Sequence, residues 1–321
     1  MDVRRSWLAP VLVALALVVT GCASKQPSTS GHGSPAASVS PAPTFPLTLT
    51  DDDGVSVTIT APPKRIITFA PSNTEIVFAL GLGSELVGVS GSFDDYPPQA
   101  KTITQVGGSG DFGVDPNVEK VVSLQPDLML TIAGGDQWKA RLRELGITVF
   151  TISATDFTDL LHDIRTVGEI TGTSAAAATL TAQMAAKEQA IEAAVAKEAR
   201  VSCFFEAYYP PLTTIGPHTF IFDLLRRAGC DPVSASAKSD YPEWSVDQLV
   251  ANGPAVYLVA SESGVSAAAV AKRPGFAAIP AVHDGKVILV SSDLISRPGP
   301  RVIDGLMALA EALHPAVFSS P

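Results

Sequence analysis

The sequence predicts an α/β protein with two similar lobes joined by one long helix, and two observations lead to this prediction. The first is a phrase that occurs twice. Residues 118–130 and 246–258 share the order Val, acid, polar residue, aliphatic residue, Val, three residues, Pro and an apolar run. Coincidence between short helix–strand joints is the alternative. The flanking phrases repeat in the same order, with 64–69 resembling 200–205 and 146–150 resembling 285–289. The repeats therefore indicate two copies of one α/β unit, and ligands usually bind between such lobes.

The second observation is the segment from Ser174 to Arg200, which lies between the two repeats. It contains twelve Ala, several Glu, Lys and Gln, and no Gly or Pro, so its helix propensity is near the maximum. A helix of this length spans about 40 Å. We expect it to connect the lobes and to resist wide hinge closure, whereas a plain surface helix within one lobe is the alternative.

The strands of the first lobe follow from alternation and from short apolar runs. Leu47–Thr50 and Val55–Thr60 alternate apolar and polar side chains around Asp-Asp-Asp-Gly, which is typical of a β-hairpin. Short apolar runs bounded by turn residues predict buried strands. These runs are Arg65–Phe69, Leu86–Ser90, Asp127–Ile132 and Ile147–Ile152.

The helices of the first lobe are marked by their start signals. Ser72-Asn73-Thr74-Glu75 resembles a capping box and predicts a helix as far as Leu80. Asp115 followed by Pro116 predicts the start of a helix that runs to about Leu124. A further helix is expected at Gln137–Leu145.

The second lobe repeats the same alternation of strands and helices. This alternation predicts parallel sheets that are covered on both faces. The expected strands are Val201–Phe205, Ala255–Ala260 and Lys286–Val290, and the expected helices are Phe220–Ala228, Val246–Asn252 and Val302–Leu313.

The N-terminus is typical of an exported lipoprotein. Arg4 and Arg5 precede a short apolar run at Leu8–Val19, and the following Thr-Gly-Cys resembles a bacterial lipobox that ends at Cys22. We expect lipidation of Cys22, with an ordinary signal peptide as the alternative. The expected segments are a signal peptide at 1–21, a flexible tether at 22–44, an N-terminal lobe at 45–172, a connecting helix at 173–200 and a C-terminal lobe at 201–321.

Charge and cysteine content narrow the class of protein. The net charge of −10 argues against nucleic acid as a partner, because a phosphate-binding surface needs clustered Lys and Arg. If Cys22 carries lipid, Cys203 and Cys230 remain as an even pair in an oxidising compartment. A disulfide between them and two buried thiols are both compatible with this count.

No catalytic or metal-binding residues are predicted. Residues 108–113 match G-x-G-x-x-G, but 114–116 separate them from the next helix, so a cleft-side loop is favoured over a dinucleotide site. The sequence has no P-loop, zincin or nucleophile-elbow motif. Its five His are scattered, without the spacing of a zinc site. We therefore expect a protein that is not an enzyme and that needs no cofactor.

Several motifs resemble one family, the substrate-binding lipoproteins of ATP-driven importers for metal chelates. Residues 93–100 (Phe-Asp-Asp-Tyr-Pro-Pro-Gln-Ala) are similar to a stretch of vitamin B12-binding proteins. Residues 62–75, 117–128 and 297–301 resemble the family's opening strand and helix, its Asn-x-Glu…Pro-Asp-Leu signature and its Arg-x-x-Pro-Arg segment. The resemblance covers about residues 60–315 and implies the class III periplasmic-binding-protein fold, with two Rossmann-like lobes bridged by a single long helix.

The resemblance also implies a function and partners. The expected protein is an extracytoplasmic, membrane-anchored monomer that captures a cobalamin-like corrinoid between its lobes. It would deliver this ligand to an ABC permease dimer with ATPase subunits. A ferric siderophore or haem in the same role is the alternative, and a lipid-anchored enzyme is a more remote one. Either a Gram-positive surface or a periplasm suits the chain.

Two acids are candidates for docking to the permease. By motif, Glu119 and Asp247 are the carboxylates, one on each lobe, that the family presents to permease arginines. The duplication places them at matching positions, and charge complementarity of this kind sets register and association rate. The alternative for each is an ordinary first-turn acid that is favoured by its helix dipole.

The candidate ligand contacts are aromatic side chains at expected strand ends and loops, together with one arginine. A bulky chelate needs flat apolar contact and a few polar anchors. By motif, Ile132 replaces a tryptophan of cobalamin binders and Ser296 replaces an acid, so the platform is altered. An arginine here could also serve a siderophore carboxylate or a haem propionate. The candidates are Phe93, Phe112, Tyr208, Tyr209, Tyr241, Trp244 and Arg297.

Overall fold

The computed structural model describes residues 43–107 and 115–319. The expected signal peptide at 1–21, most of the expected tether at 22–44, and the candidate residues Cys22 and Phe112 lie outside these ranges. Within the described ranges, no helix combines the length and the apolar character that a membrane span requires.

The first lobe contains the expected hairpin and a four-stranded parallel sheet. Strands β1 (Leu47–Thr50) and β2 (Ser56–Ile59) pair antiparallel. The sheet has the order β4-β3-β5-β6, and each neighbouring pair is parallel. Its strands are β3 (Ile66–Thr68), β4 (Leu86–Val89), β5 (Leu128–Thr131) and β6 (Val149–Thr151).

The second lobe contains another four-stranded parallel sheet of the same topology. Its order is β10-β9-β7-β8. Read from its other edge, this order is β8-β7-β9-β10. In each sheet the first strand in chain order therefore lies between the second and third strands, and the fourth strand forms an edge. The strands are β7 (Val201–Glu206), β8 (Cys230–Pro232), β9 (Val256–Ala260) and β10 (Val287–Val290).

The repeated phrases fall on equivalent elements of the two sheets. The main phrase corresponds to helix α2 (Val118–Ser123) followed by β5, and to helix α7 (Val246–Asn252) followed by β9. The flanking phrases fall on β3 and β7 and on β6 and β10. The predicted class, two α/β lobes with parallel sheets and a bridging helix, is confirmed.

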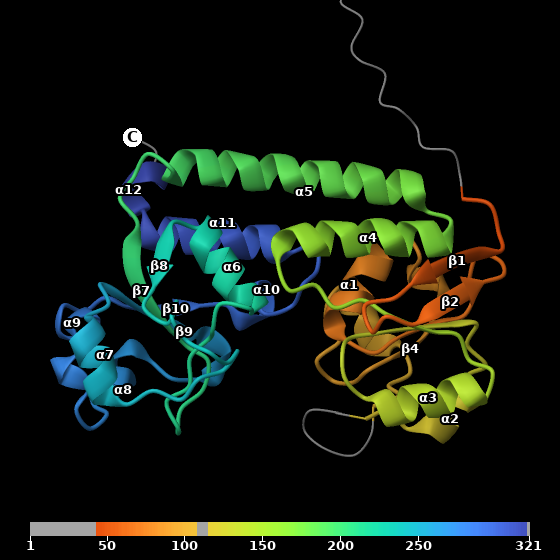
Figure 1. Cartoon of the computed structure of the whole chain (residues 1–321), viewed down its shortest axis with the longest axis horizontal. Helices are drawn as coiled ribbons and strands as arrows, with labels where there is room; N and C mark the ends of the chain where they lie inside the picture. The colour runs from red at the N-terminus through yellow and green to blue at the C-terminus, as the bar shows by residue number, and fades with distance from the viewer. Residues whose placement is uncertain (1–42, 108–114, 320–321) are drawn as a thin grey trace, which may run out of the picture. The chain divides into compact units, whose positions relative to one another are not determined.

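Helix α5 bridges the two lobes, as Figure 1 shows along its upper edge. It spans Ser174–Val195 and so ends five residues before the expected Arg200. It packs on α4 (Phe157–Thr171), which the sequence analysis missed, and on α11 (Val302–Leu313). Its buried residues recur every three or four positions, at Ala177, Thr181, Met184, Glu188, Ile191 and Val195. One side of α5 therefore faces other helices along its whole length.

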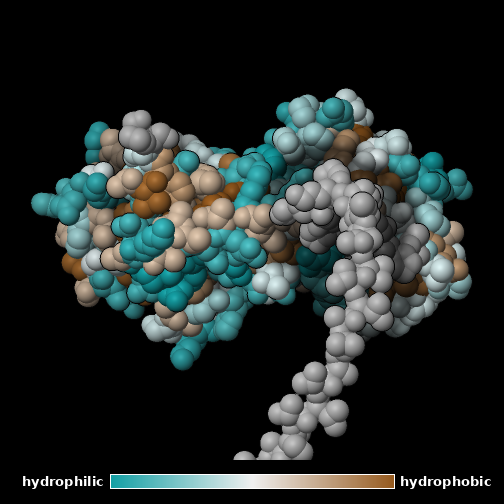
Figure 2. Space-filling view, turned by 90° about the horizontal axis from the view of Figure 1, so that it is seen from above, coloured by the Kyte–Doolittle hydropathy of each residue, from teal (hydrophilic) through white to brown (hydrophobic). Residues whose placement is uncertain are grey.

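The opposite side of α5 is exposed. Seen from that side, Figure 2 shows polar and mildly apolar surface intermixed, without one continuous strongly apolar patch. A single cluster of buried apolar side chains runs beneath α5 through both lobes, from Leu130 in β5 past Met184 to Leu306 in α11 and Leu258 in β9. This continuous core ties the lobes together through the bridging helices.

Other helices cover the faces of the two sheets. In the first lobe these are α1 (Pro71–Ala79), α2 and α3 (Asp136–Glu144). In the second lobe they include α6 (Phe220–Arg227), α7 and α11. Short helical turns complete the second lobe: α8 (Ala267–Ala271), α9 (Pro280–His283), α10 (Ser292–Ile295) and α12 (Pro315–Phe318).

Two predicted helix starts were wrong in detail. Helix α1 begins at Pro71, its N-cap is Ala70, and no side chain caps it, so Ser72 lies inside the helix rather than at its cap. Helix α2 is capped by Asn117 instead of Asp115. Helix α1 starts at Pro71 because a Pro is favoured at the first helical position. Helix α2 starts after Asn117 because the amide oxygen of this residue accepts a first-turn N–H.

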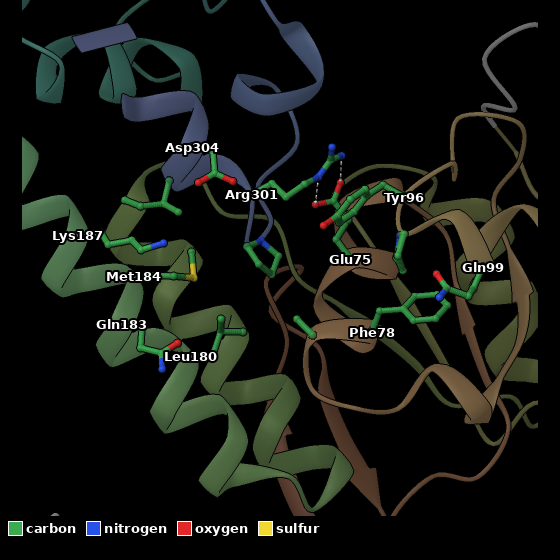
Figure 3. A pocket seen from close by; sticks show the side chains of 14 residues that line it. Glu75, Phe78, Tyr96, Gln99, Leu180, Gln183, Met184, Lys187, Arg301 and Asp304 are labelled. Carbon is green, nitrogen blue, oxygen red and sulfur yellow. Dashed lines mark hydrogen bonds and ion pairs between the residues drawn. The ribbon is translucent and has the colours of Figure 1, made fainter. Parts of the chain in front are cut away.

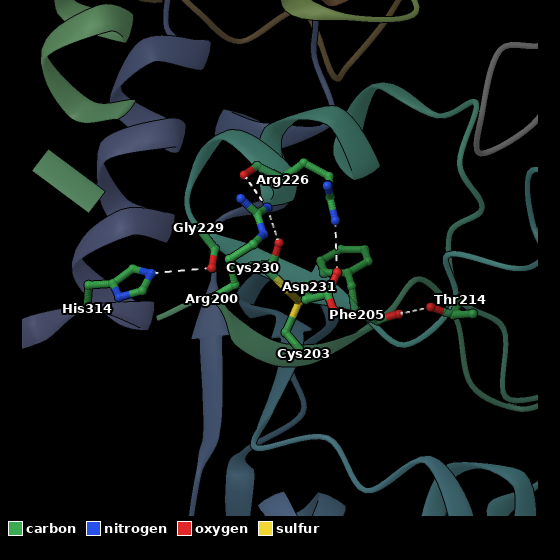
Figure 4. The surroundings of a disulfide bond; sticks show 9 residues. All are labelled: Arg200, Cys203, Phe205, Thr214, Arg226, Gly229, Cys230, Asp231 and His314. Carbon is green, nitrogen blue, oxygen red and sulfur yellow. Dashed lines mark hydrogen bonds and ion pairs between the residues drawn. A yellow bond between two sulfur atoms is a disulfide. The ribbon is translucent and has the colours of Figure 1, made fainter. Parts of the chain in front are cut away.

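A disulfide joins Cys203 in β7 to Cys230 in β8, with 6.0 Å between the Cα atoms. Figure 4 shows its surroundings, where Arg200 donates to the carbonyl oxygens of Arg226 and Cys230. Both cysteines are fully buried. The bond fastens the edge strand of the second sheet to its neighbour.

Candidate ligand-binding cleft

A cavity of about 350 Å³ lies between the lobes and takes its walls from both. From the side of the first lobe and α4 it is lined by Asn73, Ile132 and Asp163, among others. From the second lobe it is lined by residues that include Tyr241 and Arg297. The predicted inter-lobe cleft is therefore present.

A second cavity of about 370 Å³ continues the cleft over the first lobe. It shares Ala70, Pro71 and Ile132 with the first cavity and adds Trp138. Ala70 and Pro71 follow β3 and Ile132 follows β5, so this wall is built at the carboxyl ends of parallel strands. Ligands of open α/β sheets bind at such ends.

The exposed candidate aromatics differ in their relation to the cleft. Tyr241 lines the inter-lobe cavity and is 62% exposed, so its ring is available to a ligand. Phe93 and Tyr208 are also largely exposed but do not line this cavity. Ile132, at the position where the family resemblance places a tryptophan, is exposed and lines both cavities.

Tyr209 and Trp244 are packed into the second lobe instead of lining the inter-lobe cavity. Trp244 lies 5.6 Å from Phe204, measured between ring centroids, and Tyr209 lies 5.4 Å from Phe276. Both rings pack against the second lobe's apolar core. Both side chains are half-buried, so this packing holds much of their apolar area in the core, and their role as ligand contacts stays a prediction.

Arg297 lines the cleft but already has two acidic partners. Its guanidinium lies 3.2 Å from Asp95 of the first lobe and 2.5 Å from Asp293 of its own lobe. The Arg297 side chain is only 12% exposed. The ion pair with Asp95 therefore links the two lobes, and the guanidinium is less available to a ligand carboxylate than the sequence suggested.

A second arginine forms another bond between the lobes. Arg301 donates to Glu75 of α1 through two bonds, of 2.9 and 2.5 Å, and its guanidinium stacks 3.8 Å from the centroid of the Tyr96 ring. Burial raises the pKa of Glu75, while Arg301 opposes this shift. Figure 3 shows this pair at the edge of a separate cavity of about 450 Å³ between α1, α5 and α11.

Two cleft residues were not found by sequence reasoning. Asp163 is buried in α4, an element that was missed, and its pKa is raised to about 8 by burial and then by repulsion from Asp52 and Asp159. Asn73 is 1% exposed, and its Nδ2 has no hydrogen-bond partner among the described residues. Asp163 lies in no motif, and Asn73 lies in the 62–75 segment, whose resemblance concerns the strand and helix and marks no contact. The missing partner of Asn73 is visible only in three dimensions.

The two predicted docking acids occupy matching positions. Glu119 is the second residue of α2 and Asp247 the second residue of α7, and both are exposed. Each helix has the same cap, because the side chains of Asn117 and Ser245 accept from the backbone N–H three residues later. Figure 1 shows α2 and α7 on the side of the molecule away from α5.

The described residues contain no group of three or more His, Cys, Asp or Glu side chains that could hold a metal ion.

Comparisons with known proteins agree with this architecture. A family model described as periplasmic binding protein matches residues 66–294. An uncharacterized ABC transporter substrate-binding lipoprotein of Bacillus subtilis, YvrC, is 33% identical and is matched over 98% of this chain and 99% of its own length. A cobalamin-binding protein of Halobacterium salinarum is also 33% identical, over 95% of this chain and 83% of its own.

A solved structure supports the same assignment. The periplasmic vitamin B12 binding protein BtuF of Vibrio cholerae has a TM-score of 0.71 and 25% identity, covering 80% of this chain and 99% of that protein. The match of a family model over most of the chain, together with relatives that align over nearly its full length, leads to one conclusion. The chain belongs to the periplasmic binding protein family.

Proposed function

We propose that this protein is the extracytoplasmic substrate-binding component of an ABC importer and that it holds a cobalamin-like corrinoid in the inter-lobe cleft. The observation that carries the proposal is the cavity with walls from both lobes, which continues into a second cavity over the first lobe. The ligand class comes from the relatives, which are a cobalamin-binding protein in Halobacterium salinarum and a vitamin B12 binding protein in Vibrio cholerae. The role is capture and delivery, so no chemical step is required of the cleft.

The walls of the cleft suit a flat, bulky ligand. Tyr241 on one lobe and Ile132 and Trp138 on the other offer apolar area from opposite sides. Trp138 is held edge-on to Phe69, with 5.3 Å between their centroids. A ring that is supported from behind loses little freedom when it contacts a ligand, which favours affinity.

The bonds between the lobes support a rigid clamp. The Glu75–Arg301 and Asp95–Arg297 pairs cross from one lobe to the other. Wide opening would separate both pairs and expose the Glu75 carboxylate, which is now buried. We infer that ligand enters with small adjustments of the loops.

The matching acids support a docking role. Glu119 and Asp247 are exposed, lie on equivalent helices and are related by the internal duplication. We propose that they meet arginines of the two subunits of a permease dimer that works with ATPase subunits. Their charge would set orientation and association rate.

Anchoring of the chain is a separate part of the proposal. We propose lipid attachment at Cys22 after removal of residues 1–21, a tether at 22–44, lobes at 45–172 and 201–321 and a connecting segment at 173–200. Metabolic labelling with a tritiated fatty acid should mark the wild-type chain and leave Cys22→Ala unlabelled. Label on the Cys22→Ala chain would contradict this part.

Equilibrium dialysis against cyanocobalamin, dicyanocobinamide, haemin and a ferric siderophore panel tests the proposed ligand. We expect the corrinoids to be retained unchanged and to bind most tightly. Tyr241→Ala should weaken their binding roughly tenfold, by loss of a ring contact of about 1–1.5 kcal/mol. Leu289→Ala is the control, since Leu289 is exposed on β10 and does not line the cleft.

Two results would redirect the proposal. Tightest binding of haemin or of a siderophore would replace the corrinoid with that ligand in the same role. Chemical conversion of the ligand, or no retention of any member of the panel, would contradict the receptor function.

A further inference from the structure

The inference concerns the buried side chain of Asn73, in the first turn of α1. Asn73 lines the inter-lobe cavity, is 1% exposed and has no hydrogen-bond partner for Nδ2 among the described residues. A buried donor without a partner costs about 1–3 kcal/mol, and native structures usually provide an acceptor. Because Asn73 contributes to the lining of the cavity, a ligand in the cavity can supply an acceptor when the Asn73 amide turns toward it.

The surrounding backbone adds further donors. The first-turn N–H groups of a helix have no intrahelical acceptor. Helix α1 has nine residues, its N-cap Ala70 provides no side-chain bond, and its first turn contains no acid. Ser72, beside Asn73, is also buried and lines the same cavity. This end of α1 therefore presents donors and the positive end of a helix dipole to the cleft.

The charges around this corner disfavour an anionic ligand group. Arg297 lines the same cavity, but Asp95 and Asp293 both pair with it, so this group of three carries more negative than positive charge. Asp240 lines the cavity as well. The dipole of α1 attracts a carboxylate placed at Asn73, but the excess of acids around the cavity repels it, whereas a neutral carbonyl oxygen accepts hydrogen bonds without this repulsion.

We propose that Asn73, with Ser72 and the first turn of α1, forms a subsite that binds the carbonyl oxygen of a neutral carboxamide arm of the ligand and selects against carboxylate arms. This inference rests on the proposed function, because it assigns a specificity-determining contact within the same cleft. It favours a ring whose side arms are amides over one whose arms are acids.

Two corrinoids with the same ring provide the test. Dicyanocobinamide carries carboxamide arms, and dicyanocobyrinic acid carries carboxylates in their place. Equilibrium dialysis should show that the wild-type protein binds dicyanocobinamide roughly tenfold or more tightly than dicyanocobyrinic acid. The two ligands differ at every arm, so the contribution of this subsite is the part of that preference that Asn73→Ala removes. Asn73→Ala should lower the affinity for dicyanocobinamide roughly five- to tenfold and change that for dicyanocobyrinic acid little.

Thermal unfolding of the free protein separates this role from a structural one. Because Nδ2 has no partner within the described chain, Asn73→Ala should leave the Tm unchanged or raise it. Asn252→Ala is the control, since Asn252 is an exposed amide on α7, and both its dicyanocobinamide affinity and its selectivity should match the wild type.

The outcomes are distinct. Dicyanocobinamide binding that Asn73→Ala leaves unchanged, an equal loss for both corrinoids, or a wild-type preference for the carboxylate form would overturn the subsite while the receptor function stands. Failure of the wild type to retain any chelate in the panel would overturn the receptor function and the subsite together.

Discussion

The two lobes have the same strand order but hold their cleft-facing segments in different ways. In the first lobe, helix α1 follows β3 and begins with buried polar side chains, which are Ser72, Asn73, Thr74 and Glu75. Asp94 accepts hydrogen bonds from the hydroxyls of Thr74 and Ser90. This wall is fixed by hydrogen bonds and presents donors to the cleft.

The corresponding end of the second sheet is aromatic. Glu206 closes β7 and is paired with Arg273 and with the Tyr257 hydroxyl, and Arg273 stacks 4.0 Å from the centroid of the Tyr209 ring. Burial and the neighbouring Glu206 raise the pKa of Tyr257. This end of the second sheet is fixed by packing around one ion pair, and none of these four residues lines the inter-lobe cavity.

The difference shows how a duplicated unit can diverge. A topology with matching strand ends guarantees a cleft, but the side chains behind each wall decide what the wall offers. The first lobe offers oriented donors beside the apolar area of Ile132 and Trp138, and the second offers the ring of Tyr241. A ligand with both a flat ring and polar arms meets a suitable surface on each side.

The largest expected effect concerns the feature that the lobes share. Combined Glu119→Arg and Asp247→Arg substitutions should abolish uptake of labelled cyanocobalamin by cells and leave its binding in dialysis unchanged, since both acids lie outside the cleft. Each single substitution should reduce uptake less. A control pair, Asp136→Arg with Glu311→Arg, reverses exposed charges elsewhere and should keep uptake. Normal uptake by the first double variant would rule out the docking role.

The next effect concerns the disulfide between Cys203 and Cys230, which has no counterpart among the described residues of the first lobe. Replacement of Cys203 and Cys230 by Ala should lower the free energy of unfolding by roughly 3–4 kcal/mol, because a loop of 27 residues is no longer closed in the unfolded chain. Chemical denaturation measures this loss. Reducing agent should destabilise the wild type and leave the variant unaffected; equal sensitivity of the two would contradict the assignment.

The last effect concerns the pH dependence of stability and the residue Asp163, which belongs to α4 between the lobes. Its pKa is about 8 when folded, against an ordinary value of 3.8, so between these pH values the folded chain binds more protons than the unfolded chain. The stability contribution of this group is therefore complete below about pH 4 and is lost as the pH rises toward 8. Asp163→Asn should raise the Tm more at pH 8 than at pH 5. The same difference at both pH values would show that Asp163 titrates normally.

Much of the fold was predictable from local patterns. The strands, the hairpin and the bridging helix follow from apolar runs and from the Ala-rich segment at 174–200. Helix α4 was missed although its end signals are present in the sequence. Asp156 caps its first turn, and Gly172 follows its last residue. Strand β8 was missed because it has only three residues, one of them Pro.

The site was less predictable because it depends on partners that are distant in sequence. The motif identified Arg297 and Tyr241 as cleft residues, but it could not show that Asp95, about 200 positions away, occupies the guanidinium of Arg297. The aromatic residues Tyr209 and Trp244 look the same in sequence whether they face a ligand or a core. Only the tertiary contacts decide between these positions.

The central claim is that two lobes, locked by α5 and by the ion pairs between them, grip a ligand without wide opening. Spin labels at Glu144→Cys in the first lobe and Asn252→Cys in the second, in a Cys22→Ser background, would report the distance between the lobes. We predict one narrow distance distribution that moves by less than about 2 Å when cyanocobalamin is added. A broad distribution in the free protein, or a shift on the order of 10 Å on binding, would contradict the rigid-clamp account.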